Sequence, residues 1–325
     1  MKVSVIIPIF NVEKFIERCA TTLMKQTLRE VEYIFVDDAT PDNSIRILED
    51  VIAQNPYRRE QVHIVHHSEN KGLPAARNTG LALATGEYIF HCDSDDYVEP
   101  TMLEELYNAA QNNNADIVWC DWYLTFAQNE RYMKQPSYDS ALAALKAMLS
   151  GAMKYNVWNK LVRRSLYTDN NIVFPEGHGM GEDMTMIMLF VHTHNVTYLP
   201  KAFYHYVKLN TSAFCQTYSV HHLEDMLYNV KRITDYIQQY CRGKLTQELA
   251  FFKLETKFPF LITDDWTKYH LWQEWYPEAN YYISKNKNIS FRNRMVQWCA
   301  WKRQLWLVWL YYKVVYKFVY GILYR

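Results

Sequence analysis

The 325-residue sequence has no excess of charge of either sign, because 35 Lys and Arg balance 35 Asp and Glu. A neutral chain lacks the broad basic surface that a phosphate backbone requires, so we expect no nucleic-acid partner. Its six cysteines are scattered, with no CxxC or CxH pair among them. Such spacing fits neither a zinc site nor a disulfide framework, and it indicates a reducing compartment.

Long apolar runs are also missing. The N-terminal run Val3–Ile7 is too short for a signal peptide and has no small-residue cleavage site, so we interpret it as a buried strand of a cytoplasmic protein. Near the C-terminus the longest uncharged stretch, Gln304–Tyr312, has nine residues. A spanning helix needs about 20 apolar residues, so we expect no membrane crossing. Internal repeats and low-complexity linkers are absent as well.

Strand and helix signals alternate along the first 125 residues. Segments with helical spacing separate five short apolar runs that read as buried strands. These runs are Val3–Ile7, Tyr33–Val36, Val62–Val65, Tyr88–Cys92 and Ile117–Cys120. The alternation predicts an α/β fold with a doubly wound, mostly parallel sheet and helices on both faces. Beyond residue 219 the pattern changes to long helices, so we place a domain boundary near residue 215, between regions 1–215 and 216–325.

Acidic residues are clustered at the ends of two predicted strands. Asp37 and Asp38 follow the second strand, and Asp93, Asp95 and Asp96 follow the strand Tyr88–Cys92. In a doubly wound sheet, ligands bind beyond the carboxyl ends of the strands. Clustered carboxylates repel one another unless a divalent cation lies among them, and their hard oxygens select Mg²⁺ or Mn²⁺. The alternative is that these residues are helix caps and turn residues.

A turn that leads into a helix lies between the two acidic clusters. Gly72 and Pro74 mark the turn, and Arg77 follows about one helical turn later. A helix N-terminus with an arginine is suited to phosphate oxygens. The simpler alternative is a surface arginine on an ordinary helix.

These motifs, in this order, resemble the family 2 glycosyltransferases of the GT-A fold, in particular bacterial enzymes that build capsular and other surface polysaccharides. The matching stretches lie within about residues 1–215. They are VSVIIPIFN at 3–11, FVDDATPD at 35–42, NKGLPAARNTG at 70–80, GEYI at 86–89, DSDD at 93–96, WNKL at 158–161 and GED at 181–183. The resemblance implies a GT-A nucleotide-sugar-binding and catalytic domain at 1–215, followed by a helical extension.

The resemblance also implies roles for single residues. Pro8, Asp37 and Asp38 match positions that line the nucleobase and ribose, and Arg77 matches one near the base and phosphates. The DxD motif, Asp93 and Asp95, would bind the ribose and the metal that bridges the diphosphate. Asp183 would be the general base of an inverting reaction, which must lie within hydrogen-bond reach of the acceptor hydroxyl. At Ala39-Thr40-Pro41 the chain departs from the common DDGSTD pattern, which puts the usual Ser/Thr hydrogen bonds there in doubt.

Three further side chains are candidates with simpler alternatives. Lys160 could reach a donor phosphate or the acceptor, or be a solvated lysine. His205 could approach the metal or the diphosphate, or be a core histidine. His178 lies in the glycine-rich stretch 177–181, which we interpret as a mobile acceptor loop. The expected donor is a UDP-sugar, by analogy with related enzymes, and the expected acceptor is a saccharide or a lipid-linked sugar.

The C-terminal 36 residues carry seven Lys or Arg and no acidic residue, whereas the rest of the chain has 28 basic and 35 acidic residues. Trp and Tyr side chains interleave with these basic residues from 298 onward. A helix of this kind lies in the membrane interface, with its aromatic rings among the headgroups and its cations on anionic lipid. We therefore expect peripheral attachment to the inner face of the cytoplasmic membrane. Packing of this helix on the catalytic domain, or on another subunit of a homo-oligomer, is the alternative.

Two other functions remain open. A nucleotidyltransferase also uses a doubly wound sheet and acidic metal ligands, but it needs a glycine-rich phosphate loop after the first strand. The residues Pro8-Ile9-Phe10-Asn11 contain no glycine. A catalytically inactive membrane-associated scaffold would be expected to lose its carboxylates, which are present. Both are therefore disfavoured relative to a glycosyltransferase.

Overall fold

The structure is a computed structural model that describes residues 1–209 and 220–323. It divides into two compact units, Met1–Ala143 with Tyr155–Ile233, and Ala144–Lys154 with Thr234–Arg325. The boundary expected near residue 215, like Cys215 itself, falls outside the described residues. Two helices contribute residues to both units, and each unit is treated separately below.

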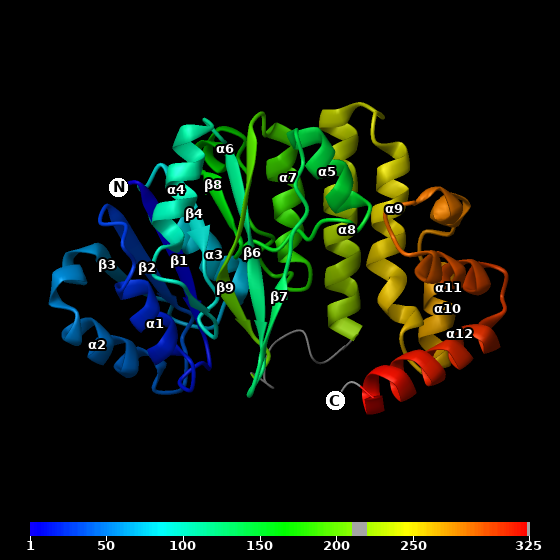
Figure 1. The fold of residues 1–325 in the computed structure, drawn as a ribbon, viewed down its shortest axis with the longest axis horizontal. Helices are drawn as coiled ribbons and strands as arrows, with labels where there is room; N and C mark the ends of the chain where they lie inside the picture. The colour runs from blue at the N-terminus through cyan, green and yellow to red at the C-terminus, as the bar shows by residue number, and fades with distance from the viewer. Residues whose placement is uncertain (210–219, 324–325) are drawn as a thin grey trace. The chain divides into compact units, whose positions relative to one another are not determined.

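The first unit is built on a mixed sheet with the strand order β3-β2-β1-β4-β8-β6-β9-β5, to which β7 is added beside β6 (Figure 1). The strands are β1 (Val3–Ile9), β2 (Val31–Asp37), β3 (Val62–His66), β4 (Tyr88–His91), β5 (Tyr97–Val98), β6 (Ile117–Thr125), β7 (Glu130–Met133), β8 (Lys160–Arg163) and β9 (Val196–Val207). Strands β1 to β4 pair in parallel, as predicted. Antiparallel pairing begins at β8, which lies between β4 and β6.

Helices connect the parallel strands. In the first unit they are α1 (Ile16–Met24), α2 (Ser44–Gln54), η1 (Pro56–Gln61), α3 (Leu73–Leu83), α4 (Met102–Asn112), α6 (Arg164–Asp169), η2 (Glu182–Met184) and α7 (Thr185–His192). The chain runs outward from β1 to β3 and then returns through α3 to β4, on the other side of β1. With right-handed crossovers, α1 and α2 cover one face and α3 covers the other. The order therefore reverses between β1 and β4, where doubly wound sheets bind ligands.

Burial explains why the central strands form. Every residue of β1, β2 and β4 is buried, as expected for parallel strands that are covered on both faces. Gly80 lets α3 approach this sheet closely, since a Cβ atom at this position would lie 2.4 Å from Cγ2 of Ile6. The predicted α/β fold with a helical extension is confirmed.

The second unit is helical. Its helices are α9 (Thr246–Lys257), η4 (Phe258–Leu261), α10 (Trp266–Glu274), η5 (Pro277–Lys285), α11 (Phe291–Trp301), α12 (Leu305–Tyr311) and the π-helix η6 (Tyr312–Leu323). Two helices, α5 (Ala141–Leu149) and α8 (Val220–Cys241), contribute to both units. The C-terminal segment is interrupted between α11 and α12, where Arg303 has a φ of 59°. Within the described residues, every helix is too short or too polar to cross a bilayer.

Candidate active site

Asp37 and Asp38 organise the loops at the carboxyl end of β2. Asp38 is 3% exposed, and its two oxygens accept hydrogen bonds from the backbone N–H groups of Lys71 and Gly72, both at 2.8 Å. His67 lies 2.7 Å from the same carboxylate. Asp38 thereby fixes the turn that starts α3. Pro8 is buried and pairs with Val36 near the carboxyl ends of β1 and β2. Pro8, Asp37 and Asp38 therefore lie at the same end of the two strands.

Arg77 and Asp93 form the central ion pair of the site. Arg77 projects from α3 and is 1% exposed, and its Nη2 lies 2.8 Å from Oδ1 of Asp93, which follows β4. Its Nε and Nη1 atoms are buried and have no hydrogen-bond partner among the described residues. A buried guanidinium with unused donors is costly unless a ligand supplies acceptors.

The acidic cluster after β4 contains residues with two different tasks. Asp96 is fully buried and accepts hydrogen bonds from the Tyr204 hydroxyl and the Val207 N–H. Burial raises the pKa of Asp96 well above its ordinary value, and the charges of Asp95 and Asp93 add to this rise. The Tyr204 hydroxyl also accepts from the backbone N–H of Asp93. Asp96 and Tyr204 therefore hold the cluster in place, while Asp93 keeps about a quarter of its side chain exposed.

Asp183 lies in the electrostatic field of the same ion pair. Burial raises the pKa of its carboxyl, Arg77 opposes the rise and Asp93 adds to it. The Oδ1 atom of Asp183 is buried without a hydrogen-bond partner among the described residues. Burial likewise raises the pKa of the neighbouring Glu182, and the charge of Asp183 adds to the effect. Asp183 thus lies near enough to Arg77 and Asp93 for their charges to shift the pKa of its carboxyl.

Lys160 is not a solvated lysine. It is 1% exposed at the start of β8, and its ammonium donates to the backbone oxygen of Asn156 at 2.7 Å and to Oδ1 of Asn159 at 2.9 Å. Burial lowers the pKa of Lys160 to about 7, although the charge of Asp183 opposes this shift. A buried lysine near Asp183 can influence the proton affinity of that carboxylate.

His205 belongs to a separate group of side chains. Its two ring nitrogens lie 2.7 Å from Glu130 and 2.9 Å from Glu99, and its ring is stacked between Tyr97 and Tyr123. Among the described residues, no group of three or more His, Cys, Asp or Glu side chains is arranged to hold a metal ion. Because both ring nitrogens contact a glutamate, His205 would have to give up its contact with Glu130 or Glu99 before it could bind a metal ion.

The glycine-rich stretch before Asp183 is tied to α8, a contact that the sequence did not predict. Asp225 is 2% exposed and lies 3.0 Å from Nδ1 of His178, while its other oxygen accepts from the Gly179 N–H at 3.1 Å. Asn229, one turn later, donates to the Met180 backbone oxygen at 2.8 Å. Asp225 and Asn229 lie at i, i+4 spacing on one face of α8, together with Arg232, which donates to the Thr185 hydroxyl at 3.1 Å. This run of polar residues is a local signal of the role.

The other end of this loop is anchored on α3. The side chain of Asn78 accepts a hydrogen bond from the Phe174 N–H at 2.8 Å and donates to the Phe174 backbone oxygen at 3.0 Å. Asn78 directly follows Arg77, so one helix positions both the guanidinium and the segment that leads to Asp183. The arrangement can offer the guanidinium and its unused donors to an anionic ligand, beside carboxylates that can take a proton or bind a cation.

A doubly wound sheet with an arginine and carboxylates at its reversal point has its charged groups where α/β proteins of this class bind ligands. Residues 4–185, more than half of the chain, match the family described as Glycosyl transferase family 2. The chain therefore belongs to the family 2 glycosyltransferases, and the predicted enzyme class is confirmed.

Curated relatives have the same character. The chain is 36% identical over 189 residues to the "Uncharacterized glycosyltransferase EpsJ" of Bacillus subtilis (strain 168). The aligned region covers 56% of this chain and 53% of EpsJ. The chain is 31% identical over 193 residues to the "Poly(ribitol-phosphate) beta-glucosyltransferase" of Bacillus spizizenii, over 58% of this chain and 29% of that protein. The chain thus spans about half the length of EpsJ and a smaller part of the glucosyltransferase.

A solved structure shares the fold over nearly the whole chain. Residues 1–349 of S. aureus TarS, crystallised with UDP-GlcNAc, match with a TM-score of 0.69 at 22% identity, over 96% of this chain and 92% of that one. The likeness therefore extends beyond the family-matched residues into the helical part. It supports the GT-A fold with a helical extension.

Proposed function

We propose that the chain transfers a sugar from a nucleotide-sugar, most simply a UDP-sugar, to a hydroxyl of a saccharide or lipid-linked acceptor in bacterial surface polysaccharide synthesis. The observation that carries this proposal is the ion pair of the buried Arg77 with the partly exposed Asp93, which lies beside Asp183. Two guanidinium nitrogens and one carboxylate oxygen there are buried and have no partner in the part of the chain that the structure describes. A diphosphate and an acceptor hydroxyl are groups that would satisfy them.

The proposed donor is supported by the residues at the carboxyl ends of β1 and β2 and by the relatives. We propose that Pro8, Asp37 and Asp38 contact the nucleoside, because they lie at these strand ends and Asp38 fixes the turn before α3. Arg77 and Lys160 are assigned to the side of the diphosphate. UDP-GlcNAc is the ligand of TarS, and a polyol phosphate polymer is the acceptor in the name of one relative. Both support a UDP-sugar donor and a polymer acceptor by analogy only.

A divalent cation fits the carboxylates after β4. Asp93 and Asp95 offer hard oxygen ligands, and Mg²⁺ or Mn²⁺ commonly uses one or two carboxylates together with phosphate oxygens and water. A set of only two side chains is consistent with the lack of a larger ligand group among the described residues. When bound there, the cation would neutralise charge on the departing diphosphate.

The protein's own residues supply the proton transfer. Asp183 takes the proton of the acceptor hydroxyl as the new bond to the anomeric carbon forms and the bond to the diphosphate breaks. Attack from the face opposite the leaving group inverts the anomeric configuration. Burial lowers the pKa of the Arg77 guanidinium, but the carboxylates of Asp93 and Asp183 raise it overall. Arg77 therefore stays positively charged beside the base.

Asp183→Asn tests the base. The amide keeps the shape and accepts hydrogen bonds, but it cannot take a proton, so we expect transfer to fall by about 100-fold or more. Donor binding, measured by thermal shift with UDP-sugars and Mn²⁺, should survive. Asp50→Asn, at an exposed position of α2, is the control and should transfer at the normal rate. Release of UDP at an undiminished rate by Asp183→Asn would remove Asp183 from this role.

We also propose that the second unit binds an anionic membrane surface. Trp306, Leu310, Val314 and Phe318 recur every four residues along α12 and η6 and are 56%, 44%, 49% and 56% exposed. Exposed apolar residues in such a row are unfavourable in water and indicate an interaction surface. Seven basic and no acidic residues in the last 36 positions favour anionic lipid as the partner. The expected location is the inner face of the cytoplasmic membrane.

A further inference from the structure

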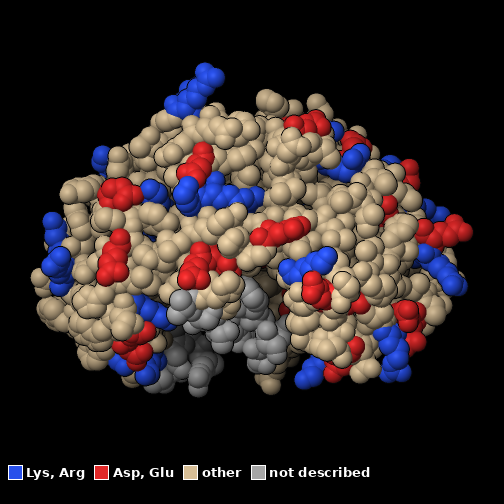
Figure 2. All heavy atoms as spheres, turned by 180° about the vertical axis from the view of Figure 1, so that it is seen from behind, with Lys and Arg blue, Asp and Glu red and all other residues tan. Residues whose placement is uncertain are grey.

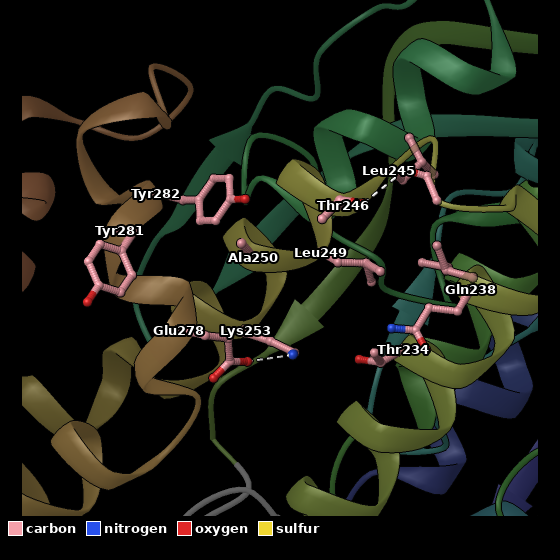
Figure 3. A pocket seen from close by; sticks show the side chains of 12 residues that line it. Thr234, Gln238, Leu245, Thr246, Leu249, Ala250, Lys253, Glu278, Tyr281 and Tyr282 are labelled. Carbon is pink, nitrogen blue, oxygen red and sulfur yellow. Dashed lines mark hydrogen bonds and ion pairs between the residues drawn. The ribbon is translucent and has the colours of Figure 1, made fainter.

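A pocket of about 550 Å³ opens within the second unit (Figure 3). Its walls come from the end of α8, the turn at 243–246, α9 and η5, and all of its lining residues lie between 234 and 282. This volume lies in the range of small-molecule sites. Its walls include none of the residues assigned to sugar transfer.

The floor of the pocket is apolar. Ile237 and Leu245 are nearly fully buried, and Leu249 and Ala250 are each 7% exposed. Tyr282 extends over the rim from η5 (Figure 3). Aliphatic and aromatic side chains at the base of a site suit a ligand that has one apolar face.

Polar groups converge on this floor from two helices. Thr234 and Gln238 point from α8 toward Lys253 on α9 (Figure 3). Thr234 is only 9% exposed, and its hydroxyl has no hydrogen-bond partner among the described residues. Lys253 pairs with Glu278 at 2.7 Å, so the wall carries no net charge from these two groups. An unpartnered buried hydroxyl that faces a cavity is a group for a ligand to satisfy.

These features select one ligand class. A phosphate group would need an uncompensated cation, but the charge of Lys253 is already balanced by Glu278. An acyl chain would leave the buried Thr234 hydroxyl unsatisfied. A pyranose ring has both an apolar face and hydroxyl groups around its edge. We propose that this pocket is a second saccharide site, which holds a neutral sugar unit of a glycan chain.

Binding can be measured on the full chain by saturation-transfer NMR. The probes are three neutral tetrasaccharides, built from glucose, from galactose or from N-acetylglucosamine. Thr234→Val keeps the shape and removes the hydroxyl, and Gln238→Ala removes the amide. Each should weaken binding about fivefold, the loss of one hydrogen bond. Gln239→Ala, the exposed neighbour that does not line the pocket, should bind as the unaltered chain does.

The outcomes separate this site from the catalytic one. Absence of saturation transfer to all three tetrasaccharides overturns the proposal. So does binding that is displaced by UDP, or binding that is equal in Thr234→Val, Gln238→Ala and the unaltered chain, because the sugar then lies elsewhere. Should Thr234→Val fail to fold, the exposed Gln238 still decides the result. UDP release from a UDP-sugar, measured in parallel, reports the transfer function independently.

Discussion

At the scale of single residues, the site is decided by where charge is buried. Within residues 1–209 and 220–323, Arg77 has one carboxylate partner and two nitrogens without a hydrogen bond, and Asp183 has one oxygen without a hydrogen bond, so a ligand would complete this centre. Asp96, although it belongs to the same cluster, accepts a hydrogen bond on each of its two carboxyl oxygens. Residues of one type and one sequence motif thus divide into a functional and a structural set, according to the atoms around them.

The pH dependence of transfer should follow Asp183. Burial raises the pKa of this carboxyl to about 6, so a base with this pKa loses its ionised form as the pH falls below about 6. We expect the rate of transfer at saturating substrate to fall about tenfold per pH unit below that point. UDP release across pH 4.5 to 8 measures it. A rate that stays level down to about pH 4.5 would contradict this assignment.

The same shift has a consequence for stability. Because the folded-state pKa is raised above that of the unfolded chain, the contribution of Asp183 to stability is complete below about pH 4 and is lost as the pH rises through about 6. Asp183→Asn has no carboxyl to ionise, so it avoids the destabilisation that ionisation of Asp183 causes. Urea unfolding at pH 7.5 should show a free energy of unfolding roughly 1–2 kcal/mol higher than that of the unaltered chain, a value reduced because Asp183 is partly exposed.

At the scale of elements, α3 joins the sheet to the site. Gly72, with a φ of 85°, forms the turn that Asp38 holds, and Arg77 and Asn78 follow on the helix. Gly80 lets this helix lie against Ile6 of β1. The position of the guanidinium therefore depends on a close approach of helix to strand that only a residue without a side chain allows.

Gly80→Ala should disturb both stability and binding. Its Cβ would lie 2.4 Å from Cγ2 of Ile6, so α3 must shift away from β1. Overpacking of this kind costs about 1–3 kcal/mol, less the helix preference of alanine. Urea unfolding measures the loss, and weaker binding of the UDP-sugar should accompany it. Leu83→Ala, at an exposed position of the same helix, should change neither quantity.

Helix α8 should act as a positioning element for the base. Asp225→Asn keeps one acceptor for the Gly179 N–H but loses the charge that pairs with His178. A small displacement of Asp183 should lower kcat by roughly 10–100-fold, while the KM for the donor stays unchanged. Glu224→Gln is the control on the same helix, because its side chain is 70% exposed. An equal loss in both variants, or a loss in donor KM alone, would contradict a positioning role.

At the scale of the whole molecule, neutrality conceals a division of charge. The last 36 residues carry seven basic and no acidic residues, whereas the preceding residues carry an acidic excess. On the face drawn in Figure 2, basic and acidic side chains intermingle without a broad area of one sign. The chain as a whole should therefore not attract a polyanion over a long distance, and only the C-terminal segment carries the positive charge to do so.

Vesicle sedimentation tests this segment in the full chain. Replacing Trp306, Leu310 and Phe318 together by serine removes apolar surface that is already exposed, so the fold should persist. Binding to vesicles rich in anionic lipid should fall by about 100-fold or more, and binding of the unaltered chain should weaken between about 0.1 and 1 M salt. Tyr57→Ser, an exposed site in the first unit, is the control. Equal sedimentation of all three proteins would refute the membrane surface.

The sequence determined those features that depend on local pattern. Buried apolar runs separated by amphipathic helices dictate parallel strands, and the chain order of Asp38, Arg77, Asp93 and Asp183 dictated which side chains were candidates. The resemblance assigned Asp93 and Asp95 to the DxD motif, but the local pattern could not show that Asp96 is fully buried and bonded to Tyr204, because that depends on the atoms that surround it.

Tertiary structure alone decided the rest. The antiparallel strand β8 between β4 and β6, the pairing of the buried Lys160 with Trp119 of β6, and the contacts of His205 with two glutamates all join residues far apart in the chain. The contacts of Asp225 with Gly179 and His178 join residues 46 and 47 positions apart, so the spacing of polar residues on α8 could not show which segment they hold. Local sequence encodes propensity and pattern, whereas the solvation and partners of a charged group are set only when distant segments meet.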